Sequence, residues 1–210
     1  MTAVVAGFYG KLPARGDFVR AALPRDFTDP WDAWLAGVMA GSRTQMGEDW
    51  LPAFLEAPVW RFALLPGLCG ERGALGLMLP SVDRAGRYFP LTFAALFAER
   101  LLLAEDPAGA AWLDRCEAAG RAALEEDAAP DRLTDMVGHP ELPAVSAGGA
   151  EEPPAARSLW WSDGSPRVPA TRLSLQGLPD AATYATMLGA QADIEPPVRG
   201  VGVEPWERPS

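Results

Sequence analysis

Three apolar segments follow one another between residues 59 and 97, and they constrain the fold more than any other part of the chain. They read VWRFALL (59–65), ALGLMLP (74–80) and RYFPLTFAALF (87–97), with short connections that contain Gly, Pro and charged residues. Such runs, bounded by Gly and Pro, are typical of buried strands. Because consecutive strands with short connections usually pair as antiparallel neighbours, we expect a meander at the centre of an antiparallel sheet.

Two other parts of the chain are expected to add strands. AVVAGFY (3–9) has the composition of a strand, and SLWWSDGSPRVPATRLSLQGLP (158–179) is typical of two strands around a turn at Asp163. Trp160 and Trp161 are consecutive, so in a strand their rings point to opposite faces. We expect one ring in the core and the other partly covered. The alternative is that Trp160, Trp161 and Asp163 form an exposed anchor for a partner.

Two longer helices are predicted from their N-terminal signals. Asp29 and Asp106 are capping residues that each precede a proline at the first helical position. The first helix carries an apolar stripe that includes Trp31 and Leu35, so it should cover one face of the sheet. Shorter helices are expected at 47–57, 132–138 and 180–190.

The size and composition favour one domain. A chain of 210 residues that is 49% hydrophobic can bury a substantial core. We expect a single α+β domain over residues 1–190, with helices flanking the antiparallel sheet. Residues 139–157, rich in Pro, Gly, Ala and Glu, are predicted to form a flexible loop, and 191–210 a Pro/Gly-rich tail without regular structure.

The charge disfavours several classes of partner. A net charge of −10 without a cluster of Lys and Arg is unfavourable for binding nucleic acid or an anionic membrane. No basic segment precedes a long apolar run and no run could span a bilayer, so we expect a cytoplasmic protein. Cys69 and Cys116 form no paired motif and are expected to be buried free thiols, and His139 is the single histidine. No metal or cofactor is therefore expected.

The segment VVAGFYGKLPARGDFVR (4–20) begins like a phosphate-binding loop. Such a loop requires Gly where Val5 stands and Ser or Thr where Leu12 stands, so the spacing excludes it. The tripeptide Arg-Gly-Asp at 15–17 is not expected to act in adhesion, because a cytoplasmic chain meets no extracellular receptor. We interpret the segment as a strand that ends near Lys11 and turns into a short helix.

Two groups of polar residues provide the candidate site. If the strand at 3–9 lies beside the hairpin formed by 74–80 and 87–97, its exit loop and the hairpin tip meet at one end of the sheet. Charges at loop tips are usually solvated, so the structural interpretation expects Lys11 to pair with Asp17 or another carboxylate on the surface. Such a surface ion pair contributes only about 0–1 kcal/mol to the stability. The candidate partner-binding or ligand-binding residues are Lys11, Arg15, Asp17, Ser81, Asp83 and Arg87.

Evidence for an enzyme is sparse. Ser81 lacks a nucleophile-elbow motif, and Ser162 has no base near it in the sequence. The carboxylates form no spaced pair or metal-binding pattern. We therefore expect no enzymatic activity.

Four segments in this order carry a family resemblance: GFYGKLPARGDFVR, DPWDAWL, PVWRFAL and LMLPSVDRAGRYFPLTF. Together they resemble the TagF family, also called ImpM, of type VI secretion-associated proteins. The resemblance covers roughly the first half of the chain and is looser beyond it, where it depends mainly on SLWWSDG. It implies an antiparallel sheet with helices packed on it, and no catalytic residues that could be assigned here.

The resemblance also implies a function. Members of this family are cytoplasmic accessory proteins that restrain type VI secretion after translation, in connection with a forkhead-associated scaffold protein and a threonine phosphorylation pathway. A binding regulator is our first hypothesis, and under it substitution of Asp83 or Arg87 should weaken binding without unfolding. The alternatives are a hydrolase or small-ligand pocket at Lys11, Ser81, Asp83 and Arg87, or a structural subunit of the apparatus.

Overall fold

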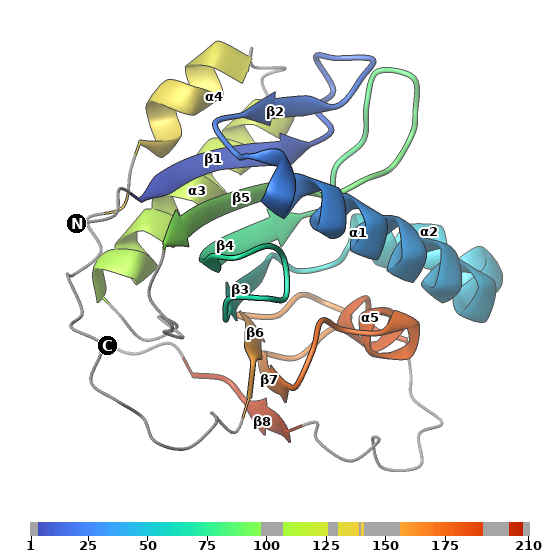
Figure 1. The fold of residues 1–210 in the computed structure, drawn as a ribbon. Helices are drawn as coiled ribbons and strands as arrows, with labels where there is room; N and C mark the ends of the chain where they lie inside the picture. Colours follow the sequence, from blue (N-terminus) through green and yellow to red (C-terminus); the bar gives the residue numbers. More distant parts are fainter. Residues whose placement is uncertain are drawn as a thin grey trace.

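The computed structural model describes residues 4–97, 107–125, 130–138, 140, 156–190 and 202–207. In this part of the chain an eight-stranded antiparallel sheet lies between two layers of helices, with strand order β2-β1-β5-β4-β3-β6-β7-β8 (Figure 1). The strands are β1 (Val5–Gly10), β2 (Val19–Ala21), β3 (Trp60–Leu64), β4 (Gly73–Leu79), β5 (Leu91–Phe97), β6 (Ser158–Ser162), β7 (Thr171–Leu175) and β8 (Gly202–Pro205). The helices are α1 (Arg25–Met46), a short 3-10 turn (Gly47–Asp49), α2 (Trp50–Leu55), α3 (Pro107–Glu125), α4 (Pro130–Val137) and α5 (Ala181–Met187).

The predicted meander and the α+β class are confirmed. Strands β3, β4 and β5 pair as antiparallel neighbours, and every residue in them is buried. Continuous apolar runs suit these strands because helices cover both faces of the sheet. Gly76 of β4 leaves room for Phe62 of β3, since a Cβ there would lie 2.4 Å from the Phe62 ring. The central strands therefore form the middle layer of the core.

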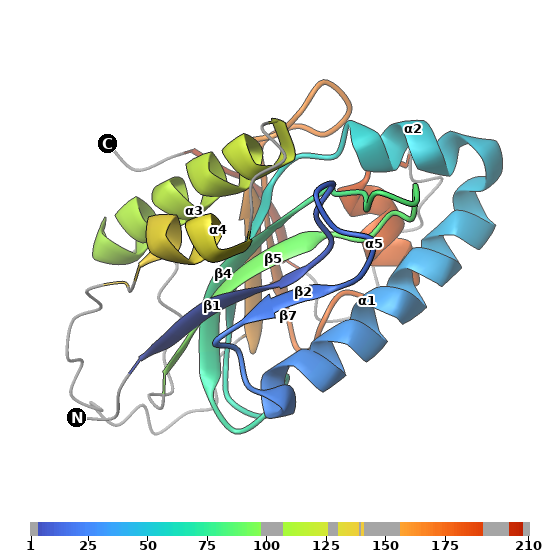
Figure 2. The ribbon, with the colours of Figure 1, turned by 90° about the horizontal axis from the view of Figure 1, so that it is seen from above.

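Helices α1, α2 and α5 cover one face of the sheet (Figure 2). Trp31 of α1 packs against Phe62, with ring centroids 4.7 Å apart, and its Nε1 donates a hydrogen bond to Thr92 Oγ1 at 3.0 Å. The predicted start of this helix at Asp29 is wrong, because α1 begins at Arg25 and includes Pro30. Phe27 stacks on Trp31 and extends the buried stripe by one turn, which favours the earlier start.

Helices α3 and α4 cover the opposite face. Helix α3 begins at Pro107 as predicted, and Trp112 and Cys116 on its inner side are buried. Arg61, the charged residue within β3, is also buried on this side. Its Nη2 donates to Asp114 Oδ1 at 2.7 Å and to Glu117 Oε2 at 3.0 Å. These two ion pairs connect the centre of the sheet to α3.

Trp160 and Trp161 point to opposite faces of β6, as predicted, but both are buried. Their exposed fractions are 0% and 3%, respectively. The expected partial cover is wrong because both sheet faces are covered by other residues, among them Trp206, whose ring centroid lies 6.0 Å from that of Trp161. The exposed-anchor alternative is therefore wrong for both tryptophans, although Asp163 in the following loop is exposed.

The predicted absence of regular structure in the C-terminal tail is wrong at one place. Residues 202–205 form β8, which pairs with β7 through Leu173 and Val203. An edge strand needs ladder hydrogen bonds on one side only, so a proline at its end is tolerated. Residues 191–201 and 208–210 of the tail lie outside the described residues, as do His139 and residues 141–155 of the predicted flexible loop.

The segment after Lys11 forms a strand instead of the expected short helix. Strand β2 pairs antiparallel with β1, with Phe8 opposite Ala21. The β-branched Val19 is buried, which favours an extended backbone. Gly7 permits a close approach of the two strands, because a Cβ there would lie 2.0 Å from the carbonyl oxygen of Ala21. Residues 11–18 are therefore the loop of a hairpin.

Candidate functional site

Two loops meet at one end of the sheet. The first loop, residues 11–18, connects β1 to β2, and the second loop, residues 80–90, connects β4 to β5. Strand β1 pairs with β5, so the exit of β1 and the entry to β5 lie side by side, as the sequence predicts. The two loops bring together Lys11, Ser81, Asp83 and Arg87, which we call the two-loop cluster.

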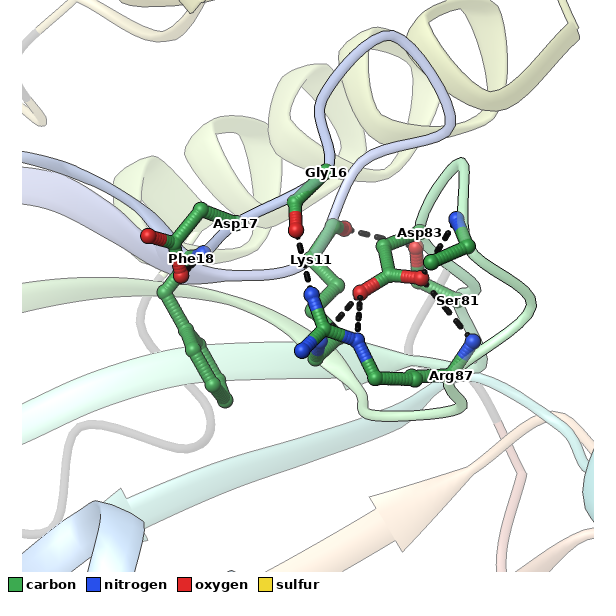
Figure 3. Close-up of polar contacts among 8 residues, drawn as sticks. Lys11, Gly16, Asp17, Phe18, Ser81, Asp83 and Arg87 are labelled. Carbon is green, nitrogen blue, oxygen red and sulfur yellow. Dashed lines mark hydrogen bonds and ion pairs between the residues drawn. The ribbon is translucent and has the colours of Figure 1, made fainter.

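Asp83 is the centre of the two-loop cluster (Figure 3). Its Oδ1 accepts hydrogen bonds from the amides of Ala85 and Arg87, both at 2.9 Å. Its Oδ2 accepts from Arg87 Nε at 2.7 Å and from Lys11 Nζ. Both the Lys11 and the Asp83 side chains are buried. Each carboxylate oxygen therefore accepts two hydrogen bonds within the cluster.

These hydrogen bonds determine the protonation of Asp83. Burial by itself raises the pKa of a carboxyl group. The hydrogen bond from Lys11, followed by those from Arg87 and Ala85, outweighs burial and holds the pKa of Asp83 well below its usual range. A carboxylate this acidic, with its oxygens occupied, is poorly suited to act as a general base near neutral pH.

The same cluster ties the backbones of the two loops together. Ser81 Oγ donates a hydrogen bond to the carbonyl oxygen of Lys11 at 2.6 Å. The amide of Arg84 donates to the carbonyl of Arg15 at 3.0 Å, and Arg87 Nη2 donates to the carbonyl of Gly16. Side chains and amides of the second loop thus bind carbonyl groups of the first loop, which fixes the conformation of both.

The expected solvated ion pair between Lys11 and a surface carboxylate is wrong. Lys11 follows β1 directly, and its Nζ lies between Asp83 and the ring of Phe18, 4.6 Å from the ring centroid. Asp17 is exposed, and its Oδ1 accepts a hydrogen bond from the amide of Phe18 at 2.8 Å. Arg15 is also exposed. Of the six candidates, Lys11, Ser81, Asp83 and Arg87 make direct side-chain contacts in the cluster, whereas Asp17 and the Arg15 side chain face solvent.

Two hollows that are lined by described residues adjoin the two-loop cluster. The first, which we call the groove, has a volume of about 440 Å³ and is lined by Met39, Ala40, Arg43, Trp50, Leu51, Gly86, Arg87 and Tyr88. The second is more open, with about 360 Å³, and is lined by residues 15–20 and Pro130. Lys11, Ser81 and Asp83 line neither hollow. Three of the four side chains of the hypothetical ligand pocket therefore bind one another or a loop carbonyl instead.

The groove includes residues that the sequence does not mark as a site. Arg43 comes from the end of α1, which we expect to cover the sheet, and Trp50 and Leu51 come from the start of α2, to which the sequence assigns no role. Leu51 and Leu55 are four residues apart on α2 and both are exposed, and this spacing places them on one face of the helix. An apolar pair on the outer face of a short helix is the one sequence signal that could have indicated the groove.

The structure also bears on reactive and metal-binding groups. Cys69 and Cys116 are free and buried, as predicted, and burial raises the pKa of the Cys69 thiol to about 12. Across the described ranges, no three His, Cys, Asp or Glu side chains lie close enough together to hold a metal ion. Within the same part of the chain, none of the helices combines the length and apolar character needed to cross a membrane.

Comparisons with known proteins give a consistent result. Residues 7–139 match the family model described as TagF N-terminal domain, type VI secretion system-associated. The crystal structure of PA0076 from Pseudomonas aeruginosa PAO1 is similar, with 36% sequence identity and a TM-score of 0.75, over 94% of this chain and 100% of that chain. No curated protein matches the chain. Both loops of the cluster lie within the matched range.

Proposed function

The chain belongs to the family of TagF N-terminal domains, which are associated with type VI secretion, and on this premise we propose that it restrains secretion by binding another protein. In this proposal the chain is a cytoplasmic accessory protein. It docks on a scaffold component of the apparatus, the forkhead-associated protein that the family resemblance implies, and keeps that component out of the assembly.

The two-loop cluster is the observation that supports a binding role over catalysis. The charged and hydroxyl groups of Lys11, Ser81 and Asp83 are buried and occupied by hydrogen bonds to one another or to a loop carbonyl. A nucleophile or general base must instead reach a substrate atom. The cluster holds the two loops in a fixed shape, and a fixed shape favours protein binding because little conformational entropy is lost on association.

Co-purification from cells tests this proposal. The affinity-tagged chain should enrich the forkhead-associated scaffold protein at least tenfold over an unrelated tagged protein. Cells with derepressed secretion provide more of the apparatus and should give a stronger enrichment. No enrichment of any secretion component in either background would refute the proposal.

Isolation of the assembled secretion apparatus distinguishes a regulator from a structural subunit. A regulator is expected to be absent from the isolated, assembled apparatus, because it binds the scaffold before assembly. Stable and stoichiometric presence in that apparatus would show a structural subunit instead. Repeating the co-purification from cells that lack the threonine kinase tests the link to phosphorylation. If the link exists, the enrichment of the scaffold protein should change in these cells.

A further inference from the structure

The groove beside the two-loop cluster has an apolar floor. Trp50 and Tyr88 line it, and the Tyr88 ring also packs edge-on against Phe54 of α2, with centroids 6.0 Å apart. Trp50 is fixed in place, because its Nε1 donates a hydrogen bond to Ser42 Oγ at 2.9 Å and its ring stacks on Phe54. A rigid aromatic floor is typical of pockets that accept an apolar anchor from a partner.

Exposed leucines extend this apolar surface out of the groove. Leu51 lines the groove and is 36% exposed, and Leu55, one turn further along α2, is 54% exposed. Single exposed apolar side chains are common on protein surfaces. Exposed apolar side chains that are grouped beside a hollow more often mark an interaction site. The outer face of α2 thus presents one exposed leucine in the groove and a second one a helical turn away from it.

Cations border the groove on two sides. The Arg43 guanidinium, at the end of α1, lies 5.6 Å from the centroid of the Trp50 ring, and Arg87 lines the groove from the second loop. None of the residues that line the groove is a carboxylate. The two loops together contain four Lys or Arg and two Asp, in a chain whose net charge is −10. The groove lining therefore carries two cations and no carboxylate, and the exposed Glu48 and Asp49 lie just outside it, on the turn before Trp50.

We infer that the groove binds an acidic segment of a protein partner. A large apolar side chain of that segment occupies the floor at Trp50 and Leu51, and its carboxylates lie opposite Arg43 and Arg87. Arg87 keeps this orientation because Asp83 and the carbonyl of Gly16 hold its guanidinium. The biological setting of the inference rests on the proposed function, whereas its recognition chemistry rests on the groove itself.

A charge reversal at Arg43 tests the inference. Arg43 is exposed, so Arg43→Glu should leave the fold intact. Because the new carboxylate repels an acidic segment, the variant should enrich the forkhead-associated scaffold protein at least tenfold less than the wild type does. Arg115→Glu on α3 is the matched control, because Arg115 is exposed on the opposite face of the sheet. Unchanged capture by Arg43→Glu overturns the inference while the proposed function stands.

Photo-crosslinking identifies the bound segment itself. A photoreactive phenylalanine analogue replaces Leu51, and a second variant carries it at Met136, which is 39% exposed on α4. The expected product at position 51 joins an acidic, apolar-anchored peptide of another protein to this chain. A peptide of neutral or basic character, a peptide of a second copy, or no product beyond the Met136 control overturns the inference. An acidic peptide from a protein outside the secretion apparatus supports the groove and contradicts the proposed function.

Discussion

Asp83 is the residue whose hydrogen bonds hold the side chains of the two-loop cluster in place. A buried carboxylate is stable only if hydrogen bonds and opposite charge replace the water that it loses. Asp83 obtains both from Lys11, Arg87 and Ala85, and these contacts leave its oxygens occupied. Its substitution is therefore expected to change the shape of both loops, and binding and unfolding cannot be separated there. Whether an Asp83 variant loses binding without unfolding therefore has to be measured with its stability beside it.

Replacing Lys11 by methionine tests the buried pair. Lys11→Met keeps an unbranched apolar stem but removes the charge-assisted hydrogen bond to Asp83. We expect the free energy of unfolding to fall by about 1.5–3 kcal/mol in urea denaturation. The control Asp17→Asn changes an exposed side chain and should stay within about 0.5 kcal/mol of the wild type. A Lys11→Met protein as stable as that control would contradict the buried pair.

The low pKa of Asp83 predicts an acid-dependent loss of stability. Because the pKa is lower in the folded than in the unfolded state, the unfolded chain binds a proton more readily as the pH falls below the ordinary value of 3.8. The contribution of Asp83 is complete above this pH and is lost progressively below it. Asp83→Asn should therefore be less stable than the wild type at pH 7, and the difference should narrow below pH 4 in denaturation series. A stability difference between Asp83→Asn and the wild type that stays constant with pH would refute the low pKa of Asp83.

At the scale of elements, the sequence predicts strands that are buried on both faces and fails at the sheet edges. Strands β3, β4 and β5 are predictable because each is a continuous apolar run with a short connection to the next. Strands β2 and β8 are short, and their formation depends on backbone pairing with a strand already in place. Local sequence carries no comparable signal for that pairing, so these two segments are predicted wrongly.

Gly→Ala substitutions at two positions have opposite expected effects on stability, one through strand pairing and the other through helix propensity. Gly7→Ala should destabilise the protein by about 1–3 kcal/mol, because the new Cβ would collide with the Ala21 carbonyl of β2. Gly37→Ala lies on the exposed side of α1 with open space around it, and should stabilise by about 0.5–1 kcal/mol. Thermal denaturation of both variants measures these shifts. A neutral Gly7→Ala would contradict the close approach of β1 and β2.

At the scale of the whole molecule, two helical layers cover the two faces of the sheet (Figures 1 and 2). The meeting of the two loops is predictable, because it requires only that β1 lies beside the meander. The groove is not predictable in the same way, since its walls come from α1, α2 and the second loop, which approach one another only in the folded chain. Whether Lys11 and Asp83 are buried likewise depends on packing that the sequence does not specify.

Type VI-dependent killing of a competitor strain measures restraint by this chain most directly. We predict that deleting the gene raises killing at least tenfold, and that the wild-type chain returns it to the original level. The folded Arg43→Glu variant, produced in equal amount, should fail to do so, whereas Arg115→Glu should succeed. Lower or unchanged killing in the deletion strain would contradict restraint of secretion. Full return of the original level by Arg43→Glu would contradict restraint through the groove.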